Sequence, residues 1–121
     1  MDEKKIIEIT DEDDVKVVSF AAESISAALD VEQVASELRE FVLANKPTRI
    51  VVDFDGVKFF SSQILGLLVD VWRKLQNYGG FFVISGINPQ LNRVFKITNL
   101  DKIFEFYPDR AGAVRAIRDK L

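Results

Sequence analysis

The stretch that decides the fold is Arg49-Ile50-Val51-Val52-Asp53-Phe54-Asp55-Gly56-Val57-Lys58-Phe59-Phe60-Ser61-Ser62-Gln63-Ile64-Leu65-Gly66. Its first part, 50–54, is a short run dominated by β-branched and aromatic residues, which predicts a strand. Asp55-Gly56 ends this strand, and Ser61 or Ser62 then offers an N-cap hydroxyl for a helix over about 63–77. Two hydroxyls therefore lie where a strand gives way to a helix. The free amides and positive dipole end of a helix start favour a phosphate at such a place.

The rest of the chain alternates between strand-like and helix-like segments. Strands are predicted over 5–10, 15–20, 81–85 and 103–106, and helices over 31–45, 89–98 and 110–120. The first two strands suggest a hairpin, whereas segment 21–29 has no clear periodicity. An initial hairpin followed by alternating helices and strands predicts an α/β fold, with a mixed sheet of four or five strands and about four helices packed on it.

Composition narrows the class of protein. A chain of 121 residues fits a single domain, 1–121, with a real core. The net charge is −3 and no basic block stands out, so nucleic acid is not an expected partner. The chain has no cysteine and no histidine, which removes thiol chemistry and the commonest general base. No segment reads as a signal peptide or approaches the roughly 20 apolar residues of a membrane span, so we expect a cytoplasmic protein without membrane insertion.

Carboxylates are plentiful and are the main candidates for metal or acid–base chemistry. The acidic turn 11–14 lacks the glycine and spaced glutamate of an EF-hand loop, which favours a solvated turn. Asp53 and Asp55 would share one face of a regular strand, where hard oxygen ligands suit Mg²⁺. The chain has no Walker-A loop, no glycine-rich dinucleotide motif and no nucleophile–base set. We therefore expect no enzyme, cofactor or metal site, and we expect Asp53 to accept backbone hydrogen bonds at the strand end.

The predicted helix 63–77 has an unusually wide apolar surface. Ile64, Leu67 and Val71 widen it to an arc of about 200°, compared with roughly 100° for an ordinary surface helix. This width predicts that at least one of the three is exposed and contacts a partner, together with Ser61 and Gln63. Burial of the extra residues by neighbouring helices is the alternative. At the first predicted helix, Asp30 and Gln33 form a pair typical of a capping box.

Four motifs give the chain a resemblance to the STAS domain family, whose bacterial members include the anti-sigma-factor antagonists. The family motif Asp-Ser-Ser-Gly-Leu-Gly falls on 61–66, with identity at Ser62, Leu65 and Gly66. Segment 78–84 resembles the family's helix end, Gly-Gly turn and next strand, and 89–100 resembles its following helix. Leu29-Asp30 resembles the pair that opens its first helix. The resemblance covers roughly 15–117 and implies a sheet with helices mainly on one face.

The resemblance also implies a function. The family's regulatory phosphoserine falls on Ser62, with Ser61 as second choice, and an acidic pocket nearby would include Asp30 and Asp53. The implied role is a bacterial, phosphorylation-regulated module that binds a serine-kinase anti-sigma factor and so regulates transcription. The alternatives are a constitutive STAS subunit of a stressosome-like particle or phospholipid-transport complex, and a STAS domain with weak nucleotide binding.

Overall fold

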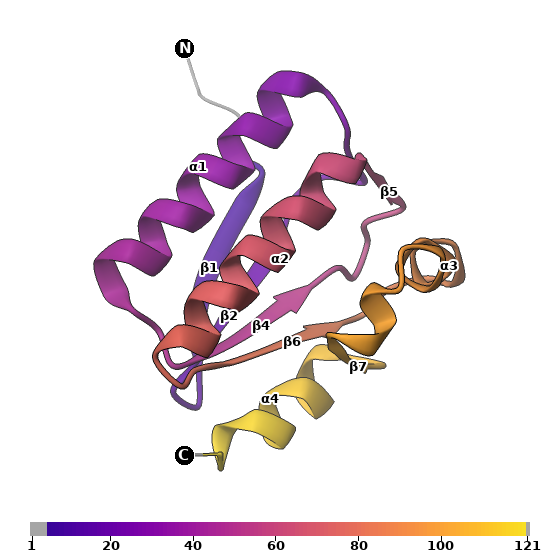
Figure 1. Cartoon of the computed structure of the whole chain (residues 1–121). Coiled ribbons are helices and arrows are strands. Elements are labelled where there is room, and N and C mark those ends of the chain that lie inside the picture. The colour runs from indigo at the N-terminus through magenta and orange to yellow at the C-terminus, as the bar shows by residue number, and fades with distance from the viewer. Residues whose placement is uncertain (1–4, 121) are drawn as a thin grey trace.

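The structure, a computed structural model, describes residues 5–120 (Figure 1). Strands and helices alternate along most of this part of the chain. In order they are β1 (Ile7–Glu12), β2 (Val15–Phe20), β3 (Ser24–Ile25), α1 (Ala28–Asn45), β4 (Arg49–Asp53), β5 (Phe59–Phe60), α2 (Ser62–Asn77), β6 (Phe81–Ser85), α3 (Pro89–Ile97), the 3₁₀ helix η1 (Leu100–Lys102), β7 (Glu105–Tyr107) and α4 (Arg110–Arg118).

Five strands form one mixed sheet in the order β1-β2-β4-β6-β7. The hairpin strands β1 and β2 are antiparallel, and every other neighbouring pair in this sheet is parallel. The predicted fold class is confirmed: the sheet is mixed and has five strands, and four α-helices pack on it. Parallel strands need a crossover connection, and α1 and α2 supply it on the two sides of β4.

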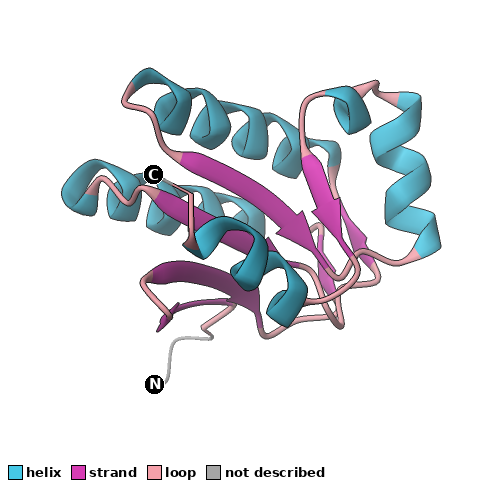
Figure 2. Cartoon of the chain, turned by 90° about the horizontal axis from the view of Figure 1, so that it is seen from below, coloured by secondary structure: helices cyan, strands magenta, loops and turns pink. Residues whose placement is uncertain are grey.

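The two faces of the sheet carry different layers of helices. Along β4, Ile50 and Val52 belong to the large core under α1, α2 and α3, whereas Val51 belongs to a smaller cluster under α4. Successive strand residues point to opposite faces, so Asp53 shares the α4 face with Val51. Helix α4 therefore covers one face alone, and the other three helices cover the opposite face (Figures 1 and 2).

A second, two-stranded sheet lies outside the main one. Strand β3, in the segment 21–29 that showed no periodicity, pairs in parallel with β5. The predicted strand 103–106 also shifts: β7 begins at Glu105, because the 3₁₀ turn η1 precedes it. Strands of two or three residues are too short to show an alternation of polar and apolar positions.

The predicted capping box at Asp30 and Gln33 is wrong. Helix α1 begins three residues earlier than predicted, at Ala28, and its N-cap is Ala27, which has no side-chain oxygen to cap it. Asp30 lies in the first turn instead, where its negative charge complements the positive end of the helix dipole. Gln33 donates a hydrogen bond to Glu37 Oε1 at 3.3 Å.

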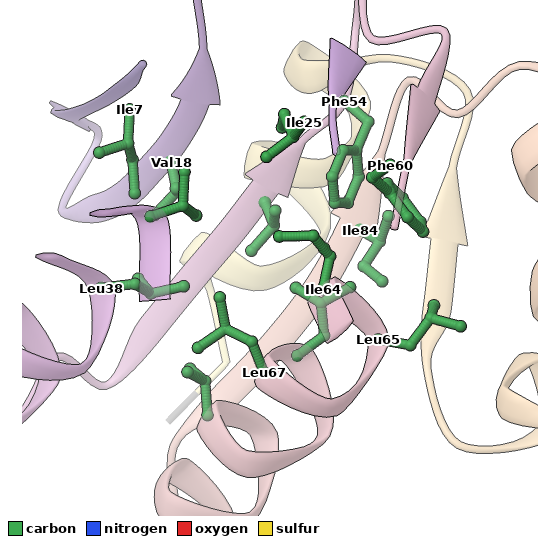
Figure 3. Close-up of a cluster of buried hydrophobic side chains, with 14 of the residues drawn as sticks. Ile7, Val18, Ile25, Leu38, Phe54, Phe60, Ile64, Leu65, Leu67 and Ile84 are labelled. Carbon is green, nitrogen blue, oxygen red and sulfur yellow. The ribbon is translucent and has the colours of Figure 1, made fainter. Parts of the chain in front are cut away.

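The predicted exposure of the wide apolar arc on α2 is also wrong. Ile64, Leu67 and Val71 are 1%, 3% and 0% exposed. Helix α2 is the central helix of its layer, with α1 on one side and α3 on the other, and the sheet beneath it (Figure 1). Figure 3 shows Ile64 and Leu67 among the buried side chains of the sheet and of α1. Burial by neighbouring elements, the alternative interpretation, explains the arc.

Candidate functional site

The serine pair lies at the start of α2, as predicted, but its two hydroxyls differ. Ser62 is the first helical residue and is exposed, as is Gln63. Ser61 is the N-cap residue, with extended backbone angles (φ −75°, ψ 160°), yet its side chain makes no capping hydrogen bond. Its Oγ is buried and has no hydrogen-bond partner within residues 5–120. Of the two hydroxyls, only that of Ser62 is placed to meet another molecule.

Two backbone amides remain free beside the Ser62 hydroxyl. The amide of Ile64 donates to the Ser61 carbonyl oxygen at 3.0 Å. The amides of Ser62 and Gln63 precede the first intrahelical hydrogen bonds and have no acceptor in the part of the chain that the structure describes. Free amides at the positive end of a 16-residue helix stabilise a negative charge placed there.

The segment before Ser62 is held by backbone hydrogen bonds to the β3 region. The amides of Lys58 and Phe59 donate to the Glu23 carbonyl oxygen at 2.7 and 3.3 Å, and the amide of Ser61 donates to the Ile25 carbonyl oxygen at 3.0 Å. The side chain of Phe60 is buried and packs against Phe54, with ring centroids 5.2 Å apart and the ring planes tilted by 50°. The serines are therefore presented by an anchored segment.

Exposed apolar side chains lie at the same end of the helical layer. Phe59 is 49% exposed and Leu29, at the start of α1, is 80% exposed. Pairing of β3 with β5 places the starts of α1 and α2 at one end of the molecule (Figure 1). Gly66, one turn into α2, is exposed, and a Cβ added there would meet no atom within 4 Å. We call the surface formed by Leu29, Phe59, Ser62, Gln63 and Gly66 the serine surface.

The sequence did not single out Phe59 or Leu29 as partner-binding residues. Of the residues it did single out, Gln63 is on the serine surface and Ser61 is half-buried. Ile64, Leu67 and Val71 belong to the core and cannot contact a partner without unfolding. The signal for Phe59 was present in the pair Phe59-Phe60, because alternate strand residues point to opposite sides and one aromatic ring must face outward.

The structure does not bring Asp30 and Asp53 together beside Ser62. Asp30 is on α1, in the helical layer that contains Ser62, whereas Asp53 is on the α4 face of the sheet. Asp53 is 3% exposed, and its Oδ1 accepts hydrogen bonds from Ser85 Oγ at 3.0 Å and from the Asp55 amide at 3.2 Å. The prediction that Asp53 accepts a backbone hydrogen bond at the strand end is confirmed.

Arg110 of α4 completes the environment of Asp53. Its Nε donates to Asp53 Oδ2 at 2.9 Å, and its Nη1 donates to Glu12 Oε2 at 3.1 Å. Burial acts to lower the pKa of Arg110, but the hydrogen bonds and charges of Asp53 and Glu12 outweigh it and raise that pKa. A cavity of about 380 Å³ lies beside this network. The hydrogen bonds of Arg110 tie α4 to the sheet. Within residues 5–120 no three acidic, histidine or cysteine side chains are grouped so that they could hold a metal ion.

Within residues 5–120, no helix is both long and apolar enough to cross a bilayer.

Comparison with known proteins matches this fold to other chains. The family model of the STAS domain matches residues 6–113. A Thermotoga maritima protein, provisionally named an anti-sigma factor antagonist, is 32% identical over 76 residues. That alignment covers 63% of this chain and 65% of the relative, so just under two thirds of the relative's length is matched.

Solved structures extend the match to nearly the whole chain. A STAS domain protein from Planctomyces limnophilus, described as an anti-sigma-factor antagonist, is 28% identical with a TM-score of 0.81, covering 91% of this chain and 96% of that one. An anti-sigma factor antagonist from Mycobacterium paratuberculosis is 32% identical with a TM-score of 0.76, covering 93% of each chain. With the family model matching most of its length and the fold matching over 91% of it, this chain belongs to the STAS domain family.

Proposed function

We propose that this protein is an anti-sigma-factor antagonist that binds an anti-sigma factor through the serine surface. The observation that carries the proposal is the exposed Ser62 hydroxyl at the start of α2, at the end of the molecule where Phe59 and Leu29 are also exposed. Exposed apolar side chains rimmed by polar groups are typical of protein–protein contact sites. The relatives named above carry the same role in their names.

Phosphorylation of Ser62 by a partner kinase would regulate this contact. A phosphate adds about −1.5 to −2 charges at neutral pH. The free amides of Ser62 and Gln63 would stabilise that charge in the unbound domain. In the complex the same charge would have to be desolvated next to apolar side chains, which is costly, so the modified domain would dissociate. Ser61 is a poor acceptor, because its Oγ is buried.

This assignment makes binding the function of the serine surface. Asp53 supports binding as the function, because its carboxylate is already hydrogen-bonded to Ser85, Asp55 and Arg110. A partner of the serine-kinase type would supply both the docking surface and the phosphoryl transfer, and the domain itself would supply the acceptor hydroxyl.

The test uses the serine-kinase anti-sigma factors encoded in the source genome, each mixed with the domain and ATP. Phosphosite mapping by mass spectrometry should find phosphate on Ser62 in the wild type and in Ser61→Ala, and none in Ser62→Ala. Ser62→Asp should weaken the complex at least tenfold in isothermal titration calorimetry while the domain stays folded. Phosphate on Ser61, or normal binding by Ser62→Asp, would contradict the proposal.

A further inference from the structure

The loop that follows β4 and the loop that follows β6 run side by side at the carboxyl edge of the sheet. Asp53 and Ser85 are register partners at the ends of these strands. The Phe54 amide donates to the Ser85 carbonyl oxygen at 2.9 Å, and Ser85 Oγ donates to Asp53 Oδ1 at 3.0 Å. A Cβ at Gly86, which has φ +71°, would lie 2.7 Å from Asp53 Oδ1. The near ends of the two loops are therefore in close contact.

Farther along, the side chain of Asn88 joins the same two loops. Its Nδ2 donates to the Val57 carbonyl oxygen at 3.2 Å, and the Lys58 carbonyl oxygen lies 3.5 Å away. Its Oδ1 accepts a hydrogen bond from the Leu91 amide at 2.7 Å and so caps α3. One amide group therefore caps one helix and holds the loop that leads to another.

That loop is the segment which presents Ser62. On its outer side the amides of Lys58, Phe59 and Ser61 are bonded to β3 and the residue before it. On its inner side, among the described residues, Asn88 is the one side chain that donates a hydrogen bond to the carbonyls of 57–58. Both the position of Phe59 and the entry angle of α2 depend on this segment, 57–61, since its residues are only one to five positions from Ser62.

We propose that Asn88 is a positioning residue for the serine surface: its amide ties the start of α3 to the segment 57–61 and so fixes how Ser62 and Phe59 are presented. The inference rests on the proposed function for its consequence, and on the hydrogen bonds alone for its structural part. A cap by itself needs only an acceptor, and aspartate or serine would serve as well as asparagine. The donor Nδ2 is the part of Asn88 that a cap does not use.

Two substitutions separate the capping hydrogen bond to the Leu91 amide from the hydrogen bond to the Val57 carbonyl, which we call the tie. Asn88→Asp keeps the acceptor for the Leu91 amide but turns a carboxylate oxygen toward the Val57 carbonyl, which is repulsive. Asn88→Ser keeps a neutral capping oxygen on a side chain too short to reach the loop. Asp109→Asn is the matched control, because Asp109 caps α4 in the same way, through the Gly112 amide at 2.7 Å, on the opposite face of the sheet.

Hydrogen–deuterium exchange of the full chain tests whether Asn88 holds segment 57–61, and it needs no partner. In both Asn88 variants the amides of Lys58, Phe59 and Ser61 should exchange about threefold to tenfold faster, as expected for the loss of one hydrogen bond. The Leu91 amide and the rest of α3 should keep their protection. Unchanged exchange at 58–61, or faster exchange confined to α3, would overturn the inference, and so would the same change in Asp109→Asn.

The rate at which the partner kinase phosphorylates Ser62 tests whether Asn88 positions Ser62 for the partner. We expect at least a threefold lower rate in both Asn88 variants and an unchanged rate in Asp109→Asn. Equal rates in all variants, with faster loop exchange, would show that the tie does not position Ser62. If the wild type itself is neither bound nor phosphorylated, the proposed function fails, and the exchange measurement still decides whether Asn88 holds the segment.

Discussion

Leu67 and Phe59 provide the sharpest test of which apolar residues face a partner. Leu67 is 3% exposed and lies in the core beneath α2, whereas Phe59 is 49% exposed on β5. Replacing each by alanine should therefore separate stability from binding. Leu67→Ala should strongly destabilise the fold and leave the serine surface intact. Phe59→Ala should destabilise the fold less and weaken partner binding.

The magnitudes follow from burial. Truncation of a buried leucine costs about 2–5 kcal/mol, so we take about 3 kcal/mol for Leu67→Ala. With a urea m-value of about 1.5 kcal/mol/M, the unfolding midpoint should fall by about 2 M. A fully buried phenylalanine would cost about 3–5 kcal/mol, and half exposure reduces this to roughly 1.5 kcal/mol, or a shift of about 1 M.

Urea unfolding can be followed by the fluorescence of Trp72, the single tryptophan, whose ring packs edge-on against Phe104 at 6.3 Å between centroids. Calorimetric titration with the anti-sigma factor then measures binding, and Phe59→Ala should weaken it at least tenfold, as truncation of an interface aromatic often does. A midpoint shift below about 0.5 M for Leu67→Ala, combined with a large loss of affinity, would refute the assignment of Leu67 to the core.

Three further predictions concern local features of the same fold. Ser61→Ala should change the free energy of unfolding by less than about 0.5 kcal/mol in chemical denaturation, because the hydroxyl caps nothing and is buried without a partner. A large loss would show that it does cap α2. Gly66→Ala should raise thermal stability by about 0.5–1 kcal/mol, whereas Gly86→Ala, with φ +71° and no room for a Cβ, should lower it by about 2 kcal/mol or more. Equal effects would contradict the geometry. The hydrogen bond from Lys74 lowers the pKa of Asp70. The stability that the Asp70 carboxylate contributes is therefore present at neutral pH and is lost as the pH falls through its folded-state pKa. Asp70→Asn should therefore be less stable than wild type by up to about 1 kcal/mol at pH 7 and equal to it near pH 2, in melts followed by circular dichroism.

Elements with long or strongly apolar patterns were predictable from the sequence. The strand at 50–54 and the helix at 63–77 appear as β4 and α2 with boundaries within one residue. The start of α1 was not predictable from capping chemistry, because its N-cap is Ala27 and the polar residue Asp30 lies inside the first turn. Strand β3 was missed because its two residues are held by pairing with β5, a contact 35 residues away in the chain.

The candidate site was also predictable only in part. The serine pair could be found from the motif, but which hydroxyl is accessible depends on the packing around Ser61, and the sequence does not show that packing. The acidic pair Asp30 and Asp53 failed to meet for a topological reason. Asp53 follows Val52 by one residue, and that single step turns its side chain to the α4 face.

The width of an apolar arc measures how much of a helix is apolar and says nothing about what covers it. On α2 the arc is filled by α1, α3 and the sheet, so the residues that widen it stabilise the core. The exposed apolar residue next to Ser62 lies on the preceding strand instead. Phe60 is 4% exposed and its neighbour Phe59 is 49% exposed, since consecutive strand residues must face opposite ways. Next to Ser62, the exposed surface therefore comes from the start of α2 and from the strand that leads into it, which is why the serine surface forms at the β5–α2 junction.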